Sequence, residues 1–407
     1  MTLKVLQIGY RGIGRKGLEA LQKLESSDEI ELEVVALAET DFEKLEEAKE
    51  KHKASGIKFF SDIENAYMEM DGFEDPVMVY DAGKVGNRSD NLFRSVEHGF
   101  YHLTEKPPSL KRDQHLSQAS LESAMWKIDY LEQENPVVQK TRKLVKNREI
   151  DSLEVFRASS SGIQKYLAPI KFSDLKGGSL MNQLLHEKYV LNLLEKSSNQ
   201  IRLDEFEVET GFQPYFNKQK LETIQNNPTT EIAPETATAQ LNISIDKDPE
   251  LEFHTCWLGA TEKLEDKASE LEEDLNHELI RSEPKELEDE IYLDQTARFF
   301  VLKGEKSLLG DLMHRKLFDL DKNKEIELLE YETGELYRGM KKAAENALNQ
   351  NLSSSVKGKQ FLEFAFDVKQ SISGGNYLDE YNESMDLLQK KVGVEKQKSK
   401  PTVETQE

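Results

Sequence analysis

The N-terminal segment holds the feature that most constrains this chain, a glycine-rich turn between an apolar strand and a helical pattern. The strand is expected at Leu3 to Ile8 and the helix at Gly17 to Leu24, with Gly9, Gly12 and Gly14 near the turn between them. Glycines there let the backbone turn sharply and approach a phosphate closely, while the amino end of the helix attracts its negative charge. The segment therefore predicts a βαβ unit that binds a dinucleotide.

The context of the turn strengthens this prediction, because a lone G-x-G-x-x-G pattern is weak evidence. Glu39 ends the next apolar strand, 22 residues after Gly17. An acidic side chain at that place accepts hydrogen bonds from ribose hydroxyls and repels a 2'-phosphate, so Glu39 favours NAD. NADP remains possible, since Thr40 could donate to a phosphate, and Arg11 and Arg15 either assist such a phosphate or are simply exposed.

The rest of the chain divides into two patterns. Strands alternate with helices over residues 1–130, which predicts an α/β Rossmann domain with a doubly wound parallel sheet. Residues 131–390 begin with a helix (Val137 to Asn147), a strand (LEVFRASS) and an apolar helix (LMNQLLHEKYVLNLLE). Longer alternating strands then follow one another without intervening helices, which predicts an α+β domain with a mostly antiparallel sheet. The strands expected there are FEVETGF, TATAQLNISI, ELEFHTCWLG, ARFFVLK and EIELLEY. An acidic insertion at about 261–290 is expected to form an exposed helix or a mobile loop, a helix from Tyr377 to Lys390 to close the fold, and 391–407 to be a disordered tail.

Composition excludes some classes of function. The net charge of −23 argues against a surface that neutralises phosphates, so no nucleic-acid partner is expected. No run approaches the roughly 18 apolar residues of a membrane span, and the start of the chain reads as a strand rather than a signal peptide. The single cysteine, Cys256, fits a reducing compartment, and a cytoplasmic protein is expected.

Two further segments carry residues suited to chemistry. Glu105, Lys106 and Pro107 follow an apolar strand, at the carboxyl edge where parallel sheets bind ligands. An ammonium group there could hold a substrate oxygen and stabilise its developing negative charge. Downstream, a glycine pair precedes a helical pattern that places Asn182 and His186 four residues apart on one face. An imidazole titrates near neutral pH and could accept a hydroxyl proton.

These motifs together resemble those of the Gfo/Idh/MocA oxidoreductases, the family of glucose-fructose oxidoreductase and inositol dehydrogenase. The resemblance spans about residues 3–390 and is carried by GYRGIGRKG, TEKPPS, QENPVVQK, GGSLMNQLLHEKY and SGGNYLDEYNESMDLL. It implies a catalytic Lys106, a cis bond before Pro107, and a second sheet with a substrate pocket on one face and a subunit interface on the other. A homodimer or homotetramer follows from the resemblance alone.

The chain also departs from the family pattern. Asn182 stands where the family usually has aspartate, and an amide cannot carry the charge that would stabilise an imidazolium. Arg88 stands where many members have histidine, which puts cofactor contacts from the preceding DAGKVGN loop in doubt.

The sequence thus predicts an NAD-dependent oxidoreductase, with NADP possible, that acts on a sugar, cyclitol or related polyol. Alternatives are a relative that reduces a non-sugar substrate or hydrolyses glycosides with bound NAD, and a non-catalytic dinucleotide-binding sensor or scaffold. No metal is predicted, because the eight histidines look scattered and none shows ligand spacing with a carboxylate or thiol. The expected catalytic residues are Lys106, His186 and Asn182, and the expected cofactor-binding residues are Gly9, Arg11, Gly12, Ile13, Gly14, Glu39, Glu105 and Lys106.

Overall fold

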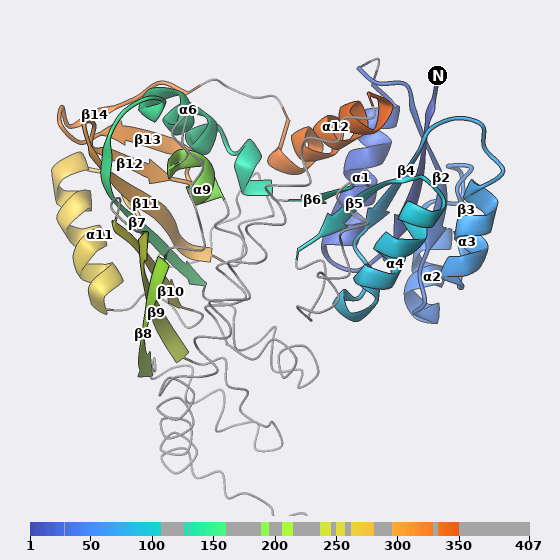
Figure 1. The fold of residues 1–407 in the computed structure, drawn as a ribbon, viewed down its shortest axis with the longest axis horizontal. Coiled ribbons are helices and arrows are strands. Elements are labelled where there is room, and N and C mark those ends of the chain that lie inside the picture. Colours follow the sequence, from blue (N-terminus) through green and yellow to red (C-terminus); the bar gives the residue numbers. More distant parts are fainter. Residues whose placement is uncertain are drawn as a thin grey trace, which may run out of the picture.

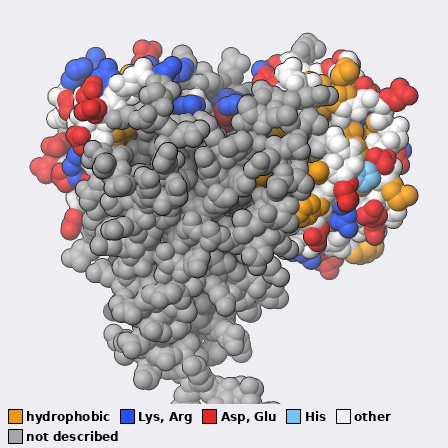
Figure 2. Space-filling view, in the orientation of Figure 1, with side chains coloured by type: hydrophobic (Ala, Val, Ile, Leu, Met, Phe, Trp, Pro, Cys, Tyr) orange, Lys and Arg blue, Asp and Glu red, His pale blue; other side chains and the backbone are white. Residues whose placement is uncertain are grey.

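The computed structural model contains two separate β-sheets (Figure 1). It describes residues 1–27, 29–106, 126–129, 131–159, 189–194, 206–214, 237–245, 250–256, 262–280, 295–328 and 333–349. The helix expected at Tyr377 to Lys390 and the tail expected at 391–407 lie outside these residues. Acidic side chains are spread over the described surface in both halves of the view in Figure 2, as the net charge suggests. Within the described ranges, no helix is long and apolar enough to cross a membrane.

The first sheet has six parallel strands in the order β3-β2-β1-β4-β5-β6. Its strands are β1 (Leu3–Ile8), β2 (Leu32–Ala38), β3 (Lys58–Phe60), β4 (Val77–Asp81), β5 (Tyr101–Glu105) and β6 (Trp126–Asp129). The helices between them are α1 (Ile13–Glu25), α2 (Phe42–Lys51), α3 (Ile63–Met70) and α4 (Val85–Glu97). This order confirms the predicted Rossmann fold, whose ligands bind where the connections reverse direction, between β1 and β4.

Local sequence explains why these helices begin where they do. Asp41 caps α2 by accepting a hydrogen bond from the Lys44 backbone N–H at 3.2 Å, and Asp62 caps α3 in the same way. Helix α1 begins directly after Gly12 and has no side-chain cap. The Gly14 N–H donates to the Arg11 carbonyl oxygen at 2.8 Å, and no side-chain cap competes with a ligand for the other N–H groups of the first turn.

The second sheet has eight strands in the order β14-β13-β12-β11-β7-β10-β9-β8. They are β7 (Ile150–Ser159), β8 (Phe206–Pro214), β9 (Ala237–Ile245), β10 (Glu250–Cys256), β11 (Gln295–Gly304), β12 (Leu308–Asp311), β13 (Lys316–Asp319) and β14 (Lys324–Glu325). All neighbouring pairs are antiparallel except β7 with β10. The expectation of a mostly antiparallel second sheet is therefore confirmed.

The two faces of the second sheet are covered by different helices. Helix α11 (Glu262–Leu275) lies on one side, and α6 (Pro136–Val145) and α9 (Tyr189–Leu194) lie on the other (Figure 1). Phe156 and Phe299 stack at 4.8 Å on the α11 side, whereas the Phe300 ring contacts Tyr189 of α9. Arg157 and Arg298 are paired directly across β7 and β11, and they alternate with the phenylalanines of the α11 side. Both arginines therefore point away from α11.

The acidic insertion differs from its expectation. Its residues 262–275 form the helix α11, as one of the two alternatives proposed, but this helix is not exposed all round. Residues 281–290 lie outside the described residues. Leu264, Ala268 and Leu271 are buried in the cluster that also contains Phe156 and Phe299. Their spacing places them on one face of the helix, so the acidic residues between them can remain in water while this stripe packs on the sheet.

Two other features were not predicted correctly. Within the described part of the segment EIELLEY, only Glu325 lies in a strand, β14, and residues 326–328 lie outside any strand, so a continuous strand over these residues is wrong. Residues 329–331 lie outside the described residues. The helix α12 (Glu335–Leu348) was not predicted at all. It lies beside α1 in Figure 1, where Leu336 and Met340 join the core cluster of Leu18 and Leu21. A helix from the range assigned to the second domain thus packs on the first sheet's domain.

A buried ion pair links the second sheet to the segment that leaves the first. Arg298 of β11 donates to Glu132 at 3.1 Å, and their side chains are 1% and 5% exposed. Glu132 belongs to the short 3-10 helix η2 (Leu131–Glu134), which follows β6.

Breaking this ion pair is expected to be costly. Arg298→Met would leave Glu132 as a buried charge and lower the free energy of unfolding by about 3–5 kcal/mol, measured by urea denaturation. The matched control is Lys316→Met, which breaks the exposed pair of Lys316 with Glu325 at 2.9 Å and is expected to change little. Equal effects of the two variants would show that burial of the first pair is unimportant.

Candidate active site

The glycine turn is folded tightly against the neighbouring strands. Gly9 and Gly12 have φ angles of +89° and +46°, which other residues rarely adopt. A Cβ atom on Gly14 would lie 2.5 Å from the carbonyl oxygen of Gly9, and one on Gly17 would lie 2.2 Å from the ring of Tyr80. The absence of side chains at these positions therefore lets α1 begin at the turn and pack closely on β4.

Gln7 stabilises this turn from beneath and was not predicted from the sequence. Its side chain is fully buried, and its amide nitrogen donates to the carbonyl oxygens of Gly9 at 2.9 Å and Gly14 at 2.7 Å. One amide thus holds both ends of the turn. A glutamine in a mostly apolar strand, two residues before a glycine turn, was the available signal.

Glu39 lies at the end of β2, as predicted, and is 6% exposed. One of its carboxylate oxygens accepts from the backbone N–H of Tyr10 and the other from that of Asp41, both at 2.8 Å. The carboxylate therefore joins the glycine turn to the start of α2. A carboxylate oxygen has more than one acceptor site, so these contacts are compatible with an additional hydrogen bond from a ribose hydroxyl.

Arg11 and Arg15 form ion pairs with carboxylates near or within α2. Arg11 pairs with Asp41, and Arg15 pairs with Glu47 at 2.5 Å, while both arginines remain more than two-fifths exposed. Both guanidinium groups are thus engaged beside the turn. Each would have to exchange a carboxylate for a 2'-phosphate in order to assist NADP.

The loop after β4 is held by Arg88. Its guanidinium donates to the carbonyl oxygens of Gly83 and Glu105, each at 3.0 Å. Asp81 accepts from the Gly83 backbone N–H and from the Asn91 amide, both at 2.8 Å. Burial raises the pKa of the Asp81 carboxyl, and the charge of Arg88 opposes that rise. Arg88 therefore joins the end of β4 to the end of β5, immediately before Lys106.

Glu105 and Lys106 lie at the end of β5, as predicted, on the same sheet edge as Gly9 and Glu39. Tyr80 donates to the Glu105 carboxylate at 3.1 Å, and Glu105 is 3% exposed. Burial raises the pKa of Glu105, and the nearby Lys106 ammonium opposes the rise. Burial likewise lowers the pKa of Lys106, and Glu105 opposes that change.

Lys106 also interacts with charges beyond the first sheet. The carboxylate of Glu132 raises its pKa, and the guanidinium of Arg157 lowers it. Arg157 belongs to β7, on the face of the second sheet opposite α11. Lys106 therefore lies within electrostatic range of that face. Pro107, Asn182 and His186 lie outside the described residues.

A buried histidine beneath the site gives the folded protein a defined dependence on pH. Burial, together with the charge of Arg88, lowers the pKa of His102 from 6.5 to about 3. Its Nδ1 is 2.8 Å from the Ser95 hydroxyl, and its Nε2 is 3.9 Å from Asp81. The imidazole is therefore neutral in the folded state at pH values where the unfolded chain would protonate it.

Since only the unfolded state takes up this proton between about pH 6.5 and pH 3, His102 destabilises the protein as the pH falls through that window. Between about pH 7.5 and pH 5, wild type should lose about 2 kcal/mol of unfolding free energy more than His102→Gln. Urea denaturation at both pH values measures the difference. Parallel losses in the two proteins would contradict the assignment.

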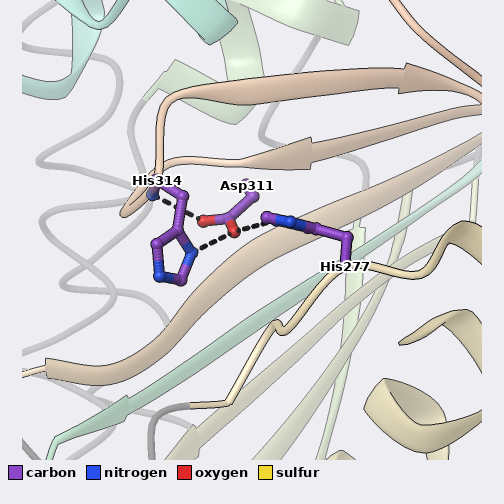
Figure 3. A group of neighbouring side chains, drawn as sticks. All are labelled: His277, Asp311 and His314. Atoms are coloured by element: carbon purple, nitrogen blue, oxygen red, sulfur yellow. Dashed lines mark hydrogen bonds and ion pairs between the residues drawn. The ribbon is translucent and has the colours of Figure 1, made fainter.

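The expectation that no histidine has a carboxylate at the spacing of metal ligands is wrong for one cluster in the second sheet's domain. His277, Asp311 and His314 converge, as Figure 3 shows. Asp311 and His314 are three residues apart, a spacing that the sequence displays. His277 is brought to them only by the packing of α11.

Comparison with known proteins supports the fold. No family model matches the chain, and no curated protein matches its sequence. Solved structures do match it. A myo-inositol 2-dehydrogenase from Lactobacillus plantarum has a TM-score of 0.62 at 11% identity, covering 92% of this chain and 98% of that one. The WlbA dehydrogenase from Bordetella pertussis, in complex with NADH and UDP-GlcNAcA, gives 0.57 at 14% identity, with 91% and 96% covered.

A biliverdin reductase from Synechocystis sp. PCC 6803, in complex with biliverdin and NADP+, has a TM-score of 0.58 at 13% identity, covering 90% of this chain and 98% of that one. The similarity to all three extends over nearly their full lengths. The chain therefore has the fold of these three proteins.

Proposed function

We propose that this chain is an NAD(P)-dependent oxidoreductase that transfers a hydride between the nicotinamide and a sugar, cyclitol or related polyol. One observation carries the proposal: the glycine turn and Lys106 lie on one edge of a Rossmann sheet, and Lys106 is within electrostatic range of the second sheet. The similarity to an inositol dehydrogenase and to a dehydrogenase that binds a UDP-sugar supports the substrate class.

The residues of the turn fit a dinucleotide. Gly12 leaves room for the pyrophosphate, because nothing lies within 4 Å of the position that its Cβ would take, and the backbone N–H of Ile13, at the uncapped start of α1, can donate to it. Gly9 and Gly14 instead let the turn fold tightly against its neighbours. Glu39 is placed to accept from the ribose hydroxyls, so NAD is the preferred cofactor. When bound, the nicotinamide supplies the acceptor or donor of the hydride.

In this proposal His186 accepts the substrate proton and Lys106 stabilises the substrate oxygen. In the oxidative direction the C–H bond breaks with its electron pair leaving as hydride, and the hydroxyl proton passes to His186 as the carbonyl forms. The Lys106 ammonium donates a hydrogen bond to the same oxygen and stabilises its negative charge. Asn182 could orient either group by hydrogen bonding but cannot share the proton.

A panel of sugars, cyclitols and polyols with NAD+ or NADP+, followed at the absorbance of the reduced nicotinamide, tests the reaction. Turnover of one substrate class, lost in His186→Ala, would support the proposal. Tight binding of NADH with no turnover across the panel would instead favour a sensor or scaffold. In that case Asn182→Asp should be measured too, because a gain of activity would identify the asparagine as the cause.

A second candidate is a reductase of a non-sugar substrate, which the similarity to biliverdin reductase favours. Reduction of a linear tetrapyrrole or an imine by NADPH, without activity on any polyol, would replace the first candidate.

We further propose that the domain boundary lies near residue 130, with α12 returning to the first domain, and that the protein forms homodimers or homotetramers. Helix α11 covers one face of the second sheet, so a subunit interface on that face would have to include this helix. Light scattering coupled to gel filtration measures the state directly.

A further inference from the structure

Three residues from separate parts of the second sheet's domain meet at one point. His277 follows the end of α11, Asp311 is the last residue of β12, and His314 lies in the turn between β12 and β13. The Asp311 carboxylate is 2.8 Å from His277 Nε2 and 2.5 Å from His314 Nδ1 (Figure 3). Both distances involve the same oxygen, Oδ2.

The backbone of the β12–β13 turn holds the Asp311 carboxylate in position. Its other oxygen, Oδ1, accepts from the backbone N–H groups of Met313 at 2.9 Å and His314 at 3.0 Å. The turn itself therefore fixes the carboxylate and directs Oδ2 at the two imidazoles. Outer hydrogen bonds of this kind orient the ligands of protein metal sites.

Burial and charge at this point favour a cation. The Asp311 side chain is 1% exposed, whereas those of His277 and His314 are 13% and 24% exposed. Buried carboxylates in proteins are paired or coordinate metals. The half-open rim leaves access for a water molecule as a further ligand.

We infer that His277, Asp311 and His314 bind a divalent first-row transition ion, with Zn²⁺ as the best match. Two imidazole nitrogens, one carboxylate oxygen and a water form a tetrahedral ligand set that suits zinc. The three ligand atoms lie within 4.8 Å of one another. Zinc bonds of about 2.0–2.2 Å would place them about 3.3 Å apart, so each histidine needs to move by less than about 1 Å.

The ion would fasten α11 to the sheet. His277 lies two residues beyond Leu275, the last residue of α11, and its ring is 4.9 Å from Phe318 of β13. A bond from His277 to the same ion as Asp311 and His314 would tie the end of the helix to the β12–β13 hairpin. The site is therefore structural, and it stands apart from the proposed hydride transfer.

The test uses the full chain after removal of metals with a chelator. Calorimetric titration with ZnCl₂ should show one equivalent bound, and Co²⁺ should give the visible absorption of a four-coordinate ion. His277→Gln and His314→Gln should each weaken zinc binding by about 100-fold or more, because loss of an outer-shell partner alone costs about 10–100-fold. Zinc should raise the thermal unfolding midpoint of wild type by about 5 °C and leave that of both variants unchanged.

The matched control is His98→Gln. His98 also contacts a carboxylate at 2.8 Å, that of Asp71, but this pair is not part of a three-ligand group within the described residues. Its zinc affinity should equal that of wild type. Absence of zinc binding by wild type would overturn the inference. Zinc binding that both His277→Gln and His314→Gln retain would also overturn it, since the ion would then lie elsewhere. If His277→Gln fails to fold, zinc binding by His314→Gln, at a partly exposed position, and the Co²⁺ spectrum of wild type still decide the question.

Discussion

Lys106→Met is expected to lower kcat by about 10²–10³-fold, the usual cost of removing a group that stabilises a developing oxyanion. Lys106 directly follows β5, the strand next to β4, and lies within electrostatic range of both Glu132 and Arg157. Because its proposed partner is the substrate oxygen, the dissociation constant for NADH should change by less than about threefold. Steady-state kinetics and NADH fluorescence measure the two quantities separately.

The control for this variant is Lys58→Met, which removes an exposed ammonium on β3 that pairs with Glu69 at 2.5 Å. It should leave kcat unchanged. If Lys106→Met weakens NADH binding as much as it slows turnover, Lys106 holds the cofactor rather than the substrate.

The pH profile gives the same residue an independent signature. The ammonium form of Lys106 is the hydrogen-bond donor, and burial lowers its pKa from 10.5. Activity should therefore fall as the pH rises through that lowered pKa, at a pH below the one expected for an ordinary lysine. The alkaline limb should be missing from the residual activity of Lys106→Met.

Gly14→Ala is expected to raise the dissociation constant for NADH by about 100-fold or more, since a methyl group would lie 2.5 Å from the Gly9 carbonyl oxygen. The turn would have to open, and its N–H groups would no longer face the pyrophosphate. Gly72→Ala is the matched control, because its new Cβ would meet only the Glu69 carbonyl oxygen at 3.4 Å and Gly72 follows α3. Unchanged NADH binding in Gly14→Ala, with a normal circular dichroism spectrum, would contradict the assigned site.

The first sheet was predictable because its signals are local. The strand, glycine turn and helix of the first βαβ unit lie within 25 residues, and the positions of Gly14 and Glu39 follow from that order. The right-handed connections of such units then leave few arrangements of the remaining strands.

The features that were missed depend on contacts between distant segments. Helix α12 docks on α1, more than 300 residues away in the chain, where Leu336 and Met340 share a core cluster with Leu18 and Leu21. Gln7 becomes a clamp only when the turn folds over it. For α11 the signal was present in the spacing of Leu264, Ala268 and Leu271, but the high density of acid between them obscured it.

Some residues of the candidate active site could be predicted from the sequence, and others could not. The sequence places Glu39 and Lys106 at strand ends, because the end of an apolar run is visible in it. It does not show that Arg88 bridges β4 and β5, or that Arg298 reaches Glu132, since these side chains span between elements. Such polar contacts are set by tertiary geometry rather than by periodicity.

Direct titration of the purified full chain with NADH and with NADPH tests the central claim most directly. Saturable binding of one dinucleotide per chain, tighter for NADH and lost in Gly14→Ala, is the predicted result. If wild type binds neither dinucleotide, the glycine turn is only a structural feature of the sheet, and the proposed oxidoreductase is wrong.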